Sequence, residues 1–229
     1  ARVPPAPSLN LQNALSLEAW IHPTGYGEFG PSGFGRIFDR ESFLLFLNDQ
    51  SPFYADQSLV FFIRQADGTS TARYSIPESI QLNQWTHVAV TYDGKSDVRF
   101  YINGEPVPVN TPADDTVFAP LRGPILSSPE EDLYFGQNRS GDRGVQGRLD
   151  ELRVWNRVRS PEEIADSFQR PLFGYEPGLV GYWPVIEARR NRLVERSGLS
   201  NHASFEGARW AEGILPGLAE DPWPEALNS

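Results

Sequence analysis

The chain lacks cysteine and methionine and has no long apolar run. Without cysteine there is no disulfide framework, so a cytosolic chain or a bacterial exported chain fits better than a small animal ectodomain. No stretch approaches the ~20 apolar residues of a membrane-spanning helix, and the first residues do not resemble a signal peptide. We therefore expect no membrane insertion. Because the chain starts with Ala and contains no Met, we expect a processed or excised piece, with other domains in a larger parent chain.

Basic residues are scarce relative to acidic ones. The chain has 20 Lys and Arg against 30 Asp and Glu, a net charge of −10. Binding to a phosphate backbone draws on clustered Lys and Arg, so we expect no nucleic-acid partner. The three histidines, His22, His87 and His202, lack the close ligand spacing of a zinc site. No G-x-S-x-G motif is present, which removes the nucleophile-elbow class of hydrolase.

Short strand-like segments separated by turns dominate what is present. "LSLEAWIH" (15–22) alternates apolar and polar residues with the period of a half-buried strand. "RIFD", "SFLLFLN" and "SLVFFIR" follow as short apolar runs. In 85–107, turn signals at Asp93-Gly94 and Asn103-Gly104 separate further strands. The pattern predicts an all-β fold of antiparallel strands.

One segment has the signals of a helix. In "SPEEIADSF", Ser160 is suited to the N-cap, Pro161 to the first helical position and Glu163 to a capping box. Ile164 and Phe168 share one face. We predict a short helix packed on a sheet edge.

Four segments together resemble a known family. "PSLNLQNALSLEAWIHPTG", "NQWTHVAVTYDG", "VRFYINGEPV" and "GRLDELRVWNRVRSPEEI" are similar to successive strands of the laminin-G-like, concanavalin A-like jelly roll, which occurs in bacterial exported proteins and distantly in pentraxins. The resemblance implies a two-sheet antiparallel jelly-roll sandwich that is extracellular or at the cell surface. It also implies a binding module more often than an enzyme.

The order of the segments departs from the family. Residues 176–210 resemble the opening of the same module, yet they come last in this chain. Either they begin a second repeat, or the chain is circularly permuted. Because a lone fragment of this size could not bury Val180, Tyr182 and Trp183, we favour a single domain over 1–210, in which 176–210 supplies the strands that usually come first. Residues 211–229 have the Pro and acid content of a tail or linker.

The resemblance also implies a calcium site. Family members often hold the ion between an Asp at the start of the "LDE" strand and a "D-x-S-G-x-x-N-H" loop. Glu195 stands where the family usually has Asp, and its longer side chain must be re-seated to reach the same ion. The alternative is that Asp150 accepts hydrogen bonds from amides of this loop and no ion is present. The matching positions here are Asp150, Glu195, Ser197, Asn201 and His202.

Catalysis by the adjacent acids Asp150 and Glu151 is the weaker hypothesis. Laminarinase-like enzymes of the same fold place their acids on alternate residues, "E-x-D-x-E", so that two carboxyl groups face one cleft about 5–5.5 Å apart. No such triplet occurs here. Strand alternation predicts that Glu151 lies on the face opposite Asp150, as a solvated or arginine-paired surface charge.

The Gly-rich loop 22–36 carries the aromatic residues Tyr26, Phe29 and Phe34. Burial is hard to arrange in such a loop, and exposed rings beside polar groups are typical contacts of carbohydrate or protein ligands. A loop that folds over the sheet and buries the rings remains the alternative.

Two classes of function remain open. We predict a non-catalytic, lectin-like module with a structural calcium ion, whose partner is a glycan or a cell-surface or extracellular protein. The alternative is a structural spacer or adhesive repeat of a large exported protein. Beside these two classes, a laminarinase-like glycoside hydrolase is a weaker third hypothesis.

Overall fold

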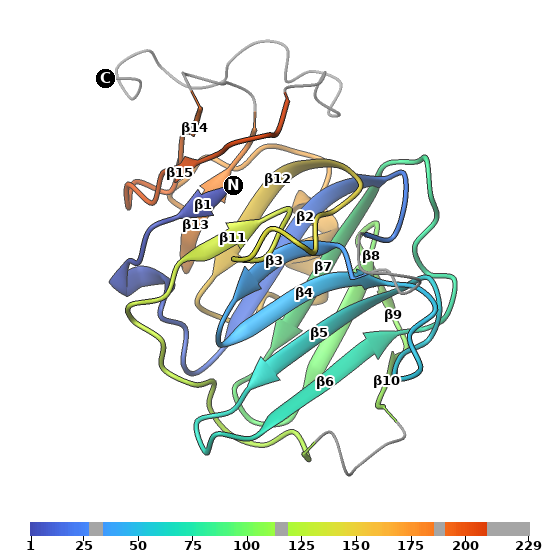
Figure 1. The fold of residues 1–229 in the computed structure, drawn as a ribbon. Helices are drawn as coiled ribbons and strands as arrows, with labels where there is room; N and C mark the ends of the chain where they lie inside the picture. Colours follow the sequence, from blue (N-terminus) through green and yellow to red (C-terminus); the bar gives the residue numbers. More distant parts are fainter. Residues whose placement is uncertain (28–33, 113–118, 186–190, 210–229) are drawn as a thin grey trace.

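The structure is a computed structural model that describes residues 1–27, 34–112, 119–185 and 191–209. The described strands form two antiparallel sheets packed face to face, the jelly-roll sandwich that the sequence predicts (Figure 1). The nine-stranded sheet runs in the order β10 (Val109–Asn110), β6 (Ser70–Ser75), β5 (Ser58–Arg64), β4 (Phe43–Asn48), β3 (Arg36–Arg40), β11 (Leu133–Phe135), β1 (Arg2–Val3), β15 (Ala203–Ser204) and β14 (Arg192–Leu193). The six-stranded sheet runs β13 (Leu179–Trp183), β12 (Gly147–Trp155), β2 (Leu15–Pro23), β7 (Thr86–Tyr92), β8 (Val98–Ile102) and β9 (Glu105–Val107).

The predicted turns join neighbouring strands. Asn103 and Gly104 have φ values of 50° and 85°, the left-handed pair of a tight hairpin, and they connect β8 to β9. Between β7 and β8, the carboxylate of Asp93 accepts the backbone N–H groups of residues 95, 96 and 97. Gly68, at φ 86°, lies in the turn from β5 to β6.

The core lies between the sheets. Alternate residues of β2, such as Leu15, Leu17 and Ile21, point into it and are fully buried. Phe38 and Phe135 pack edge-to-face across β3 and β11, and Phe135 also contacts Trp183 with ring centroids 4.7 Å apart. Strands from both ends of the chain thus share one apolar core.

The helix α1 (Pro161–Ser167) begins with the predicted capping box: the Ser160 side chain accepts the Glu163 N–H, and the Glu163 carboxylate accepts the Ser160 N–H. Ile164 clusters with Ala89 and Tyr101, which lie on β7 and β8. The helix therefore packs on the outer face of the six-stranded sheet over β7 and β8. It also contacts β9 at the edge of that sheet, so the predicted packing on a sheet edge is confirmed in part.

Residues 176–204 contribute strands to both sheets. β13 pairs with β12 at the edge of the six-stranded sheet, while β15 pairs with both β1 and β14 in the nine-stranded sheet. Arg2 lies opposite Ser204, so the first and last described strands are neighbours (Figure 1). The short 3-10 helix η1 (Pro7–Leu9) follows β1, and Ser8 accepts a hydrogen bond from Asn201.

Candidate ligand-binding and cation sites

The three aromatic residues of the Gly-rich loop have different positions. Tyr26 is only 9 % exposed, packs in the core between the sheets and donates its O–H to the Ile80 carbonyl at 2.9 Å. Phe29 lies outside the described residues. Phe34 is partly exposed and contacts Phe46 on the outer face of the nine-stranded sheet. Of the two described rings, only Phe34 is placed to meet a ligand.

Phe34 belongs to a larger aromatic platform on the outer face of β3 to β6. Buried Phe46, Val60 and Ala72 form its floor, and the partly exposed side chains pack against them. Ring centroids lie 5.8 to 6.3 Å apart from one ring to the next: Phe34 with Phe46, Phe46 with Tyr54, Tyr54 with Tyr74 and with Phe53. Phe53, 42 % exposed, is the most open ring of the platform.

Charged side chains lie beside these rings. The Arg36 guanidinium sits 4.2 Å from the centroid of the Phe46 ring, and its Nε is 3.0 Å from an Asp39 carboxylate oxygen. Arg143 lies over Phe34 at 5.6 Å. Burial lowers the pKa of Arg36 to about 10, against the opposing charge of Asp39. The platform thus combines flat apolar surface with a few fixed polar groups, the usual make-up of a ligand-binding surface.

Sequence reasoning found Phe34 but missed Tyr54 and Tyr74. Tyr54 lies in "SPFYADQ" (51–57), a polar loop whose two adjacent aromatic residues are the signal that could have identified it. Tyr74 lies on β6 at an outward position, because it pairs with Val60 of the platform floor. Only the pairing of β5 with β6 brings these rings together.

The adjacent acids lie at a β-bulge in β12. The strand register shifts between Asp150 and Arg153, and Glu151 has a φ of 51°. Asp150 pairs with Trp20 and Arg153 pairs with Glu18, so the side chains of Asp150 and Arg153 lie on the same outer face of the sheet. Glu151 is 1 % exposed and its carboxylate accepts from Arg153 at 2.6 Å. Because the bulge interrupts the alternation, the predictions of an opposite face and of a surface position were wrong, while arginine pairing is observed.

Glu151 is part of a buried charge network beneath α1, made of Glu18, His87, Glu151, Arg153 and Arg159. Glu18 accepts from Arg159 at 2.6 Å and from Arg153 at 3.5 Å. The Nε2 atom of His87 lies 3.4 Å from Glu18. The sequence analysis did not identify this network.

The network shifts the pKa values of its members in different directions. Burial would raise the pKa of Glu18, but His87, Arg159 and Arg153 together lower it. Burial raises the pKa of Glu151 despite Arg153, and burial lowers the pKa of His87. Both acids are at most 1 % exposed, so neither is reachable by a substrate.

The 195–202 loop is attached along β13. The Glu195 carboxylate oxygen Oε1 accepts the N–H groups of Tyr182, at 3.0 Å, and of Ser197. The Asn201 side-chain amide donates to the Val180 carbonyl at 2.9 Å, and the backbone carbonyl of Asn201 accepts the Trp183 indole N–H. His202 accepts the Glu195 N–H through Nδ1. Glu195 and Asn201 therefore bind this loop to β13, and Asp150 accepts the N–H of its neighbour Glu151.

Two oxygen atoms of this loop are suited to a cation. The second carboxylate oxygen of Glu195 and the hydroxyl of Ser197 are buried and accept no hydrogen bond within the described chain. Carboxylate and hydroxyl oxygens are ligands that calcium accepts. Across the described residues, however, no group of three or more His, Asp or Glu side chains is arranged to hold a metal. The loop therefore fits part of a calcium shell, and carbonyl oxygens and water would have to supply the rest.

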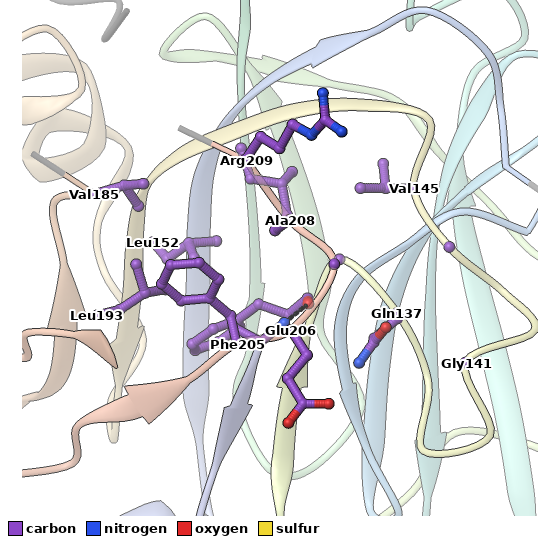
Figure 2. Close-up of a pocket in the computed structure, with 16 residues that line it drawn as sticks. Gln137, Gly141, Val145, Leu152, Val185, Leu193, Phe205, Glu206, Ala208 and Arg209 are labelled. Atoms are coloured by element: carbon purple, nitrogen blue, oxygen red, sulfur yellow. Dashed lines mark hydrogen bonds between the residues drawn. The ribbon is translucent and has the colours of Figure 1, made fainter. Parts of the chain in front are cut away.

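A pocket of about 400 Å³ opens beside β12 and β14 (Figure 2). Its walls are mixed: Leu152, Leu193 and Phe205 lie on one side, while Gln137, Glu206 and Arg209 bring polar and charged groups to it. Sugar faces stack on aromatic rings, and the platform presents a row of such rings in mutual contact, so the platform is the better candidate for a glycan.

Comparison with known proteins places the fold in a family. A profile described as "Concanavalin A-like lectin/glucanases superfamily" matches residues 1–165. The chain belongs to this superfamily. A search of curated proteins finds no match.

Solved structures of the superfamily's fold are similar at low identity. A Bacteroides ovatus protein to which carbohydrate binding has been ascribed shares 17 % identity at a TM-score of 0.60, over 88 % of this chain and 54 % of that chain. The binding domain of Paraclostridial Mosquitocidal Protein 1 shares 18 % at 0.51, over 73 % of this chain and 40 % of that one. This chain thus spans about half of the first structure and less than half of the second. The likeness shows the fold alone.

A third structure, a heptameric SAP-like pentraxin from Limulus polyphemus, shares 17 % identity over 72 % of each chain at a TM-score of 0.40, too low for a functional argument.

In the present protein, none of the helices within the described residues is long and apolar enough to cross a membrane.

Proposed function

We propose that this protein is a non-catalytic glycan-binding module of the concanavalin A-like superfamily. The observation that carries the proposal is the aromatic platform, where Phe34, Phe53, Tyr54 and Tyr74 lie partly exposed beside Arg36 and Asp39. Sugar rings present flat C–H faces that stack on aromatic rings, while their hydroxyls need polar partners close by. The platform offers both on one sheet face.

The burial of Glu18 and Glu151 supports binding without catalysis. Hydrolysis of a glycosidic bond needs two accessible carboxyl groups on either side of the bond. Glu18 and Glu151 are buried and paired with Arg153 and Arg159. The likeness of the fold to a protein with ascribed carbohydrate binding supports binding, although the superfamily includes glucanases.

A structural calcium ion is part of the proposal. Glu195 and Ser197 would hold it through their unpaired oxygens, with Asp150, Asn201 and His202 as the further ligands that the sequence suggests. The ion would keep the 195–202 loop against β13. It takes no part in a reaction.

The setting of the module is also proposed. We propose a longer parent chain with other domains, in agreement with the 54 % of the Bacteroides ovatus protein that this chain covers. We also propose an extracellular or cell-surface location, which is supported by membership of the lectin-containing superfamily. The alternative function is a spacer or adhesive repeat that binds no sugar.

A glycan array followed by calorimetry tests the proposal. We expect the wild-type domain to bind a defined set of glycans, and Tyr54→Ala to weaken binding about two- to tenfold, since one lost ring stack is worth roughly 0.5–1.5 kcal/mol. Tyr54→Phe keeps the ring and should retain most of the affinity. Arg99→Ala, on an exposed side chain of β8, is the surface control. A wild-type domain that binds nothing on the array would support the spacer.

A further inference from the structure

Two aromatic side chains outside the platform are far more exposed than any of its rings. Phe173 is 62 % and Tyr175 is 79 % exposed, while Phe53 is 42 % exposed. Their rings stack on each other with centroids 5.6 Å apart and an angle of 21° between the planes. They lie in the loop that connects α1 to β13. Exposed apolar surface of this kind, held in one arrangement, commonly marks an interaction site.

The loop that carries the pair is held firmly. Both carboxylate oxygens of Glu176 accept backbone N–H groups, from Phe173 at 2.6 Å and from Gly174 at 2.8 Å. The N–H of Leu172 donates to the Tyr182 hydroxyl at 3.2 Å. A fixed backbone conformation therefore holds the two rings exposed. Binding of a ligand that stacks on them would cost little conformational entropy in this loop.

The same loop is bound to the charge network below it. Arg153 donates to the Arg170 carbonyl at 2.7 Å, and Leu172 packs with Trp155 and Tyr182 in a small apolar cluster. The pair thus projects from the outer face of the six-stranded sheet. The aromatic platform occupies the outer face of the other sheet. The strands β3 to β6 that carry it are seen in Figure 1.

The size of the pair decides between classes of partner. Two aromatic side chains offer at most about 150–250 Å² each, whereas a stable protein interface buries roughly 1,200–2,000 Å². An anionic membrane is disfavoured by the net charge of −10 and by exposed Glu162 and Asp166 on the preceding helix. A sugar ring matches the area of one or two aromatic rings. Arg170, exposed and three residues before Phe173 in the same loop, carries hydrogen-bond donors.

We propose that Phe173 and Tyr175 form a second carbohydrate-binding surface, selective for neutral glycans and independent of the aromatic platform. This inference rests on the proposed glycan-binding function. Neutral sugars are favoured because the net charge of −10 disfavours acidic ones. With one surface on each outer face, a single domain would hold two glycan chains.

The test is isothermal titration calorimetry of the domain with neutral cello-, xylo-, arabino- and manno-oligosaccharides, which measures the number of sites and their affinity. We expect two sites per wild-type domain, and one site in Phe173→Ala/Tyr175→Ala and in Phe34→Ala/Tyr54→Ala. The four-residue variant should bind none. Since Phe173 and Tyr175 are exposed, their double variant should melt at the wild-type temperature, which keeps loss of binding separate from loss of folding.

The outcomes separate the two proposals. Unchanged affinity and stoichiometry in Phe173→Ala/Tyr175→Ala would overturn the second surface and leave the proposed function intact. Loss of all binding in that variant, with none lost in Phe34→Ala/Tyr54→Ala, would support the second surface and overturn the role of the platform. A wild-type domain that binds none of the four sugars would overturn this inference, and a silent glycan array as well would overturn glycan binding itself.

Discussion

The outer face of the six-stranded sheet carries charges sealed under a helix, whereas the outer face of the nine-stranded sheet carries aromatic rings that water still reaches. On the first face, Glu18 and Arg153 are fully buried beneath α1. On the second, Tyr54 and Tyr74 stay partly exposed above a floor of Phe46 and Val60. Side-chain type alone would suggest the reverse, since charges usually face water. What covers a sheet decides which of its residues a ligand can touch.

The largest expected effect comes from removing strands common to both faces. A chain that ends at Arg170 lacks β13, β14 and β15, and with them Trp183 in the core. We expect this fragment to be unfolded, because both sheets and the core lose buried residues. Circular dichroism melting and amide dispersion in NMR provide the measurement.

A chain that ends at Arg209 is the control for this truncation and should melt cooperatively near the temperature of the full chain. A soluble, cooperatively melting 1–170 fragment would mean that residues 176–210 belong to a second repeat, and that the single domain over 1–210 is incorrect.

The charge network should be the next most sensitive feature. Arg153→Met leaves Glu18 and Glu151 buried without their shared partner, and breaking a buried pair in this way costs about 3–5 kcal/mol. Urea denaturation measures the free energy of unfolding. Arg148→Met, on an exposed residue of the same strand, should change it by less than about 0.5 kcal/mol.

A second substitution sharpens the result. Adding Glu151→Gln to Arg153→Met removes one buried negative charge that has lost its arginine partner, and it should recover part of the lost free energy of unfolding. If Arg153→Met alone is as stable as Arg148→Met, the network does not stabilise the covered face.

Calcium should have a smaller effect, confined to the 195–202 loop. If the ion binds only the folded state, calcium at 100 times its dissociation constant adds about 2.7 kcal/mol to the free energy of unfolding. Glu195→Ala and Asp150→Ala should each abolish the calcium-dependent rise in melting temperature, while Glu206→Ala, on an exposed acid, leaves it. Equal melting temperatures in calcium and in chelator would rule the ion out and leave Glu195 as a hydrogen-bonded loop anchor.

The smallest effect is a pH dependence on the covered face. Burial lowers the pKa of His87 below its usual value near 6.5. Its neutral form therefore stabilises the fold above that value, and this stability is lost as the pH falls below it, by at most about 1.4 kcal/mol per pH unit. His87→Gln should flatten the stability profile below about pH 6.5, where the unfolded state takes up a proton that the buried imidazole does not.

Two other groups must be separated from His87. The pKa of His202 is also lowered by burial, so its contribution has the same sign and persists in His87→Gln. The raised pKa of Glu151 gives the opposite sign, with stability lost as the pH rises through it. The pH titration of stability is therefore repeated in Glu151→Gln with and without His87→Gln, and the difference between the two slopes is the contribution of His87. An unchanged slope in His87→Gln would show that His87 does not contribute.

Local patterns in the sequence were sufficient for the fold class, while the two-sheet jelly roll was predicted from the family resemblance. Alternation in 15–22, the turn at Asn103-Gly104 and the capping signals at Ser160 and Glu163 depend on residues close together in the chain, so each could be predicted without knowledge of the partners. These signals determine the all-β class, the hairpins and the helix, because backbone geometry limits which residues fit them.

The accessible surface was decided only in three dimensions. The bulge at Glu151 reversed an alternation argument that holds for regular strands, and Tyr26 packed inside while Phe34 stayed outside although both come from one loop. The platform and the charge network each join residues distant in the chain, such as Tyr54 with Tyr74 and Glu18 with Arg159. Strand pairing sets these contacts and the helix sets their burial, and neither leaves a short-range pattern in the sequence.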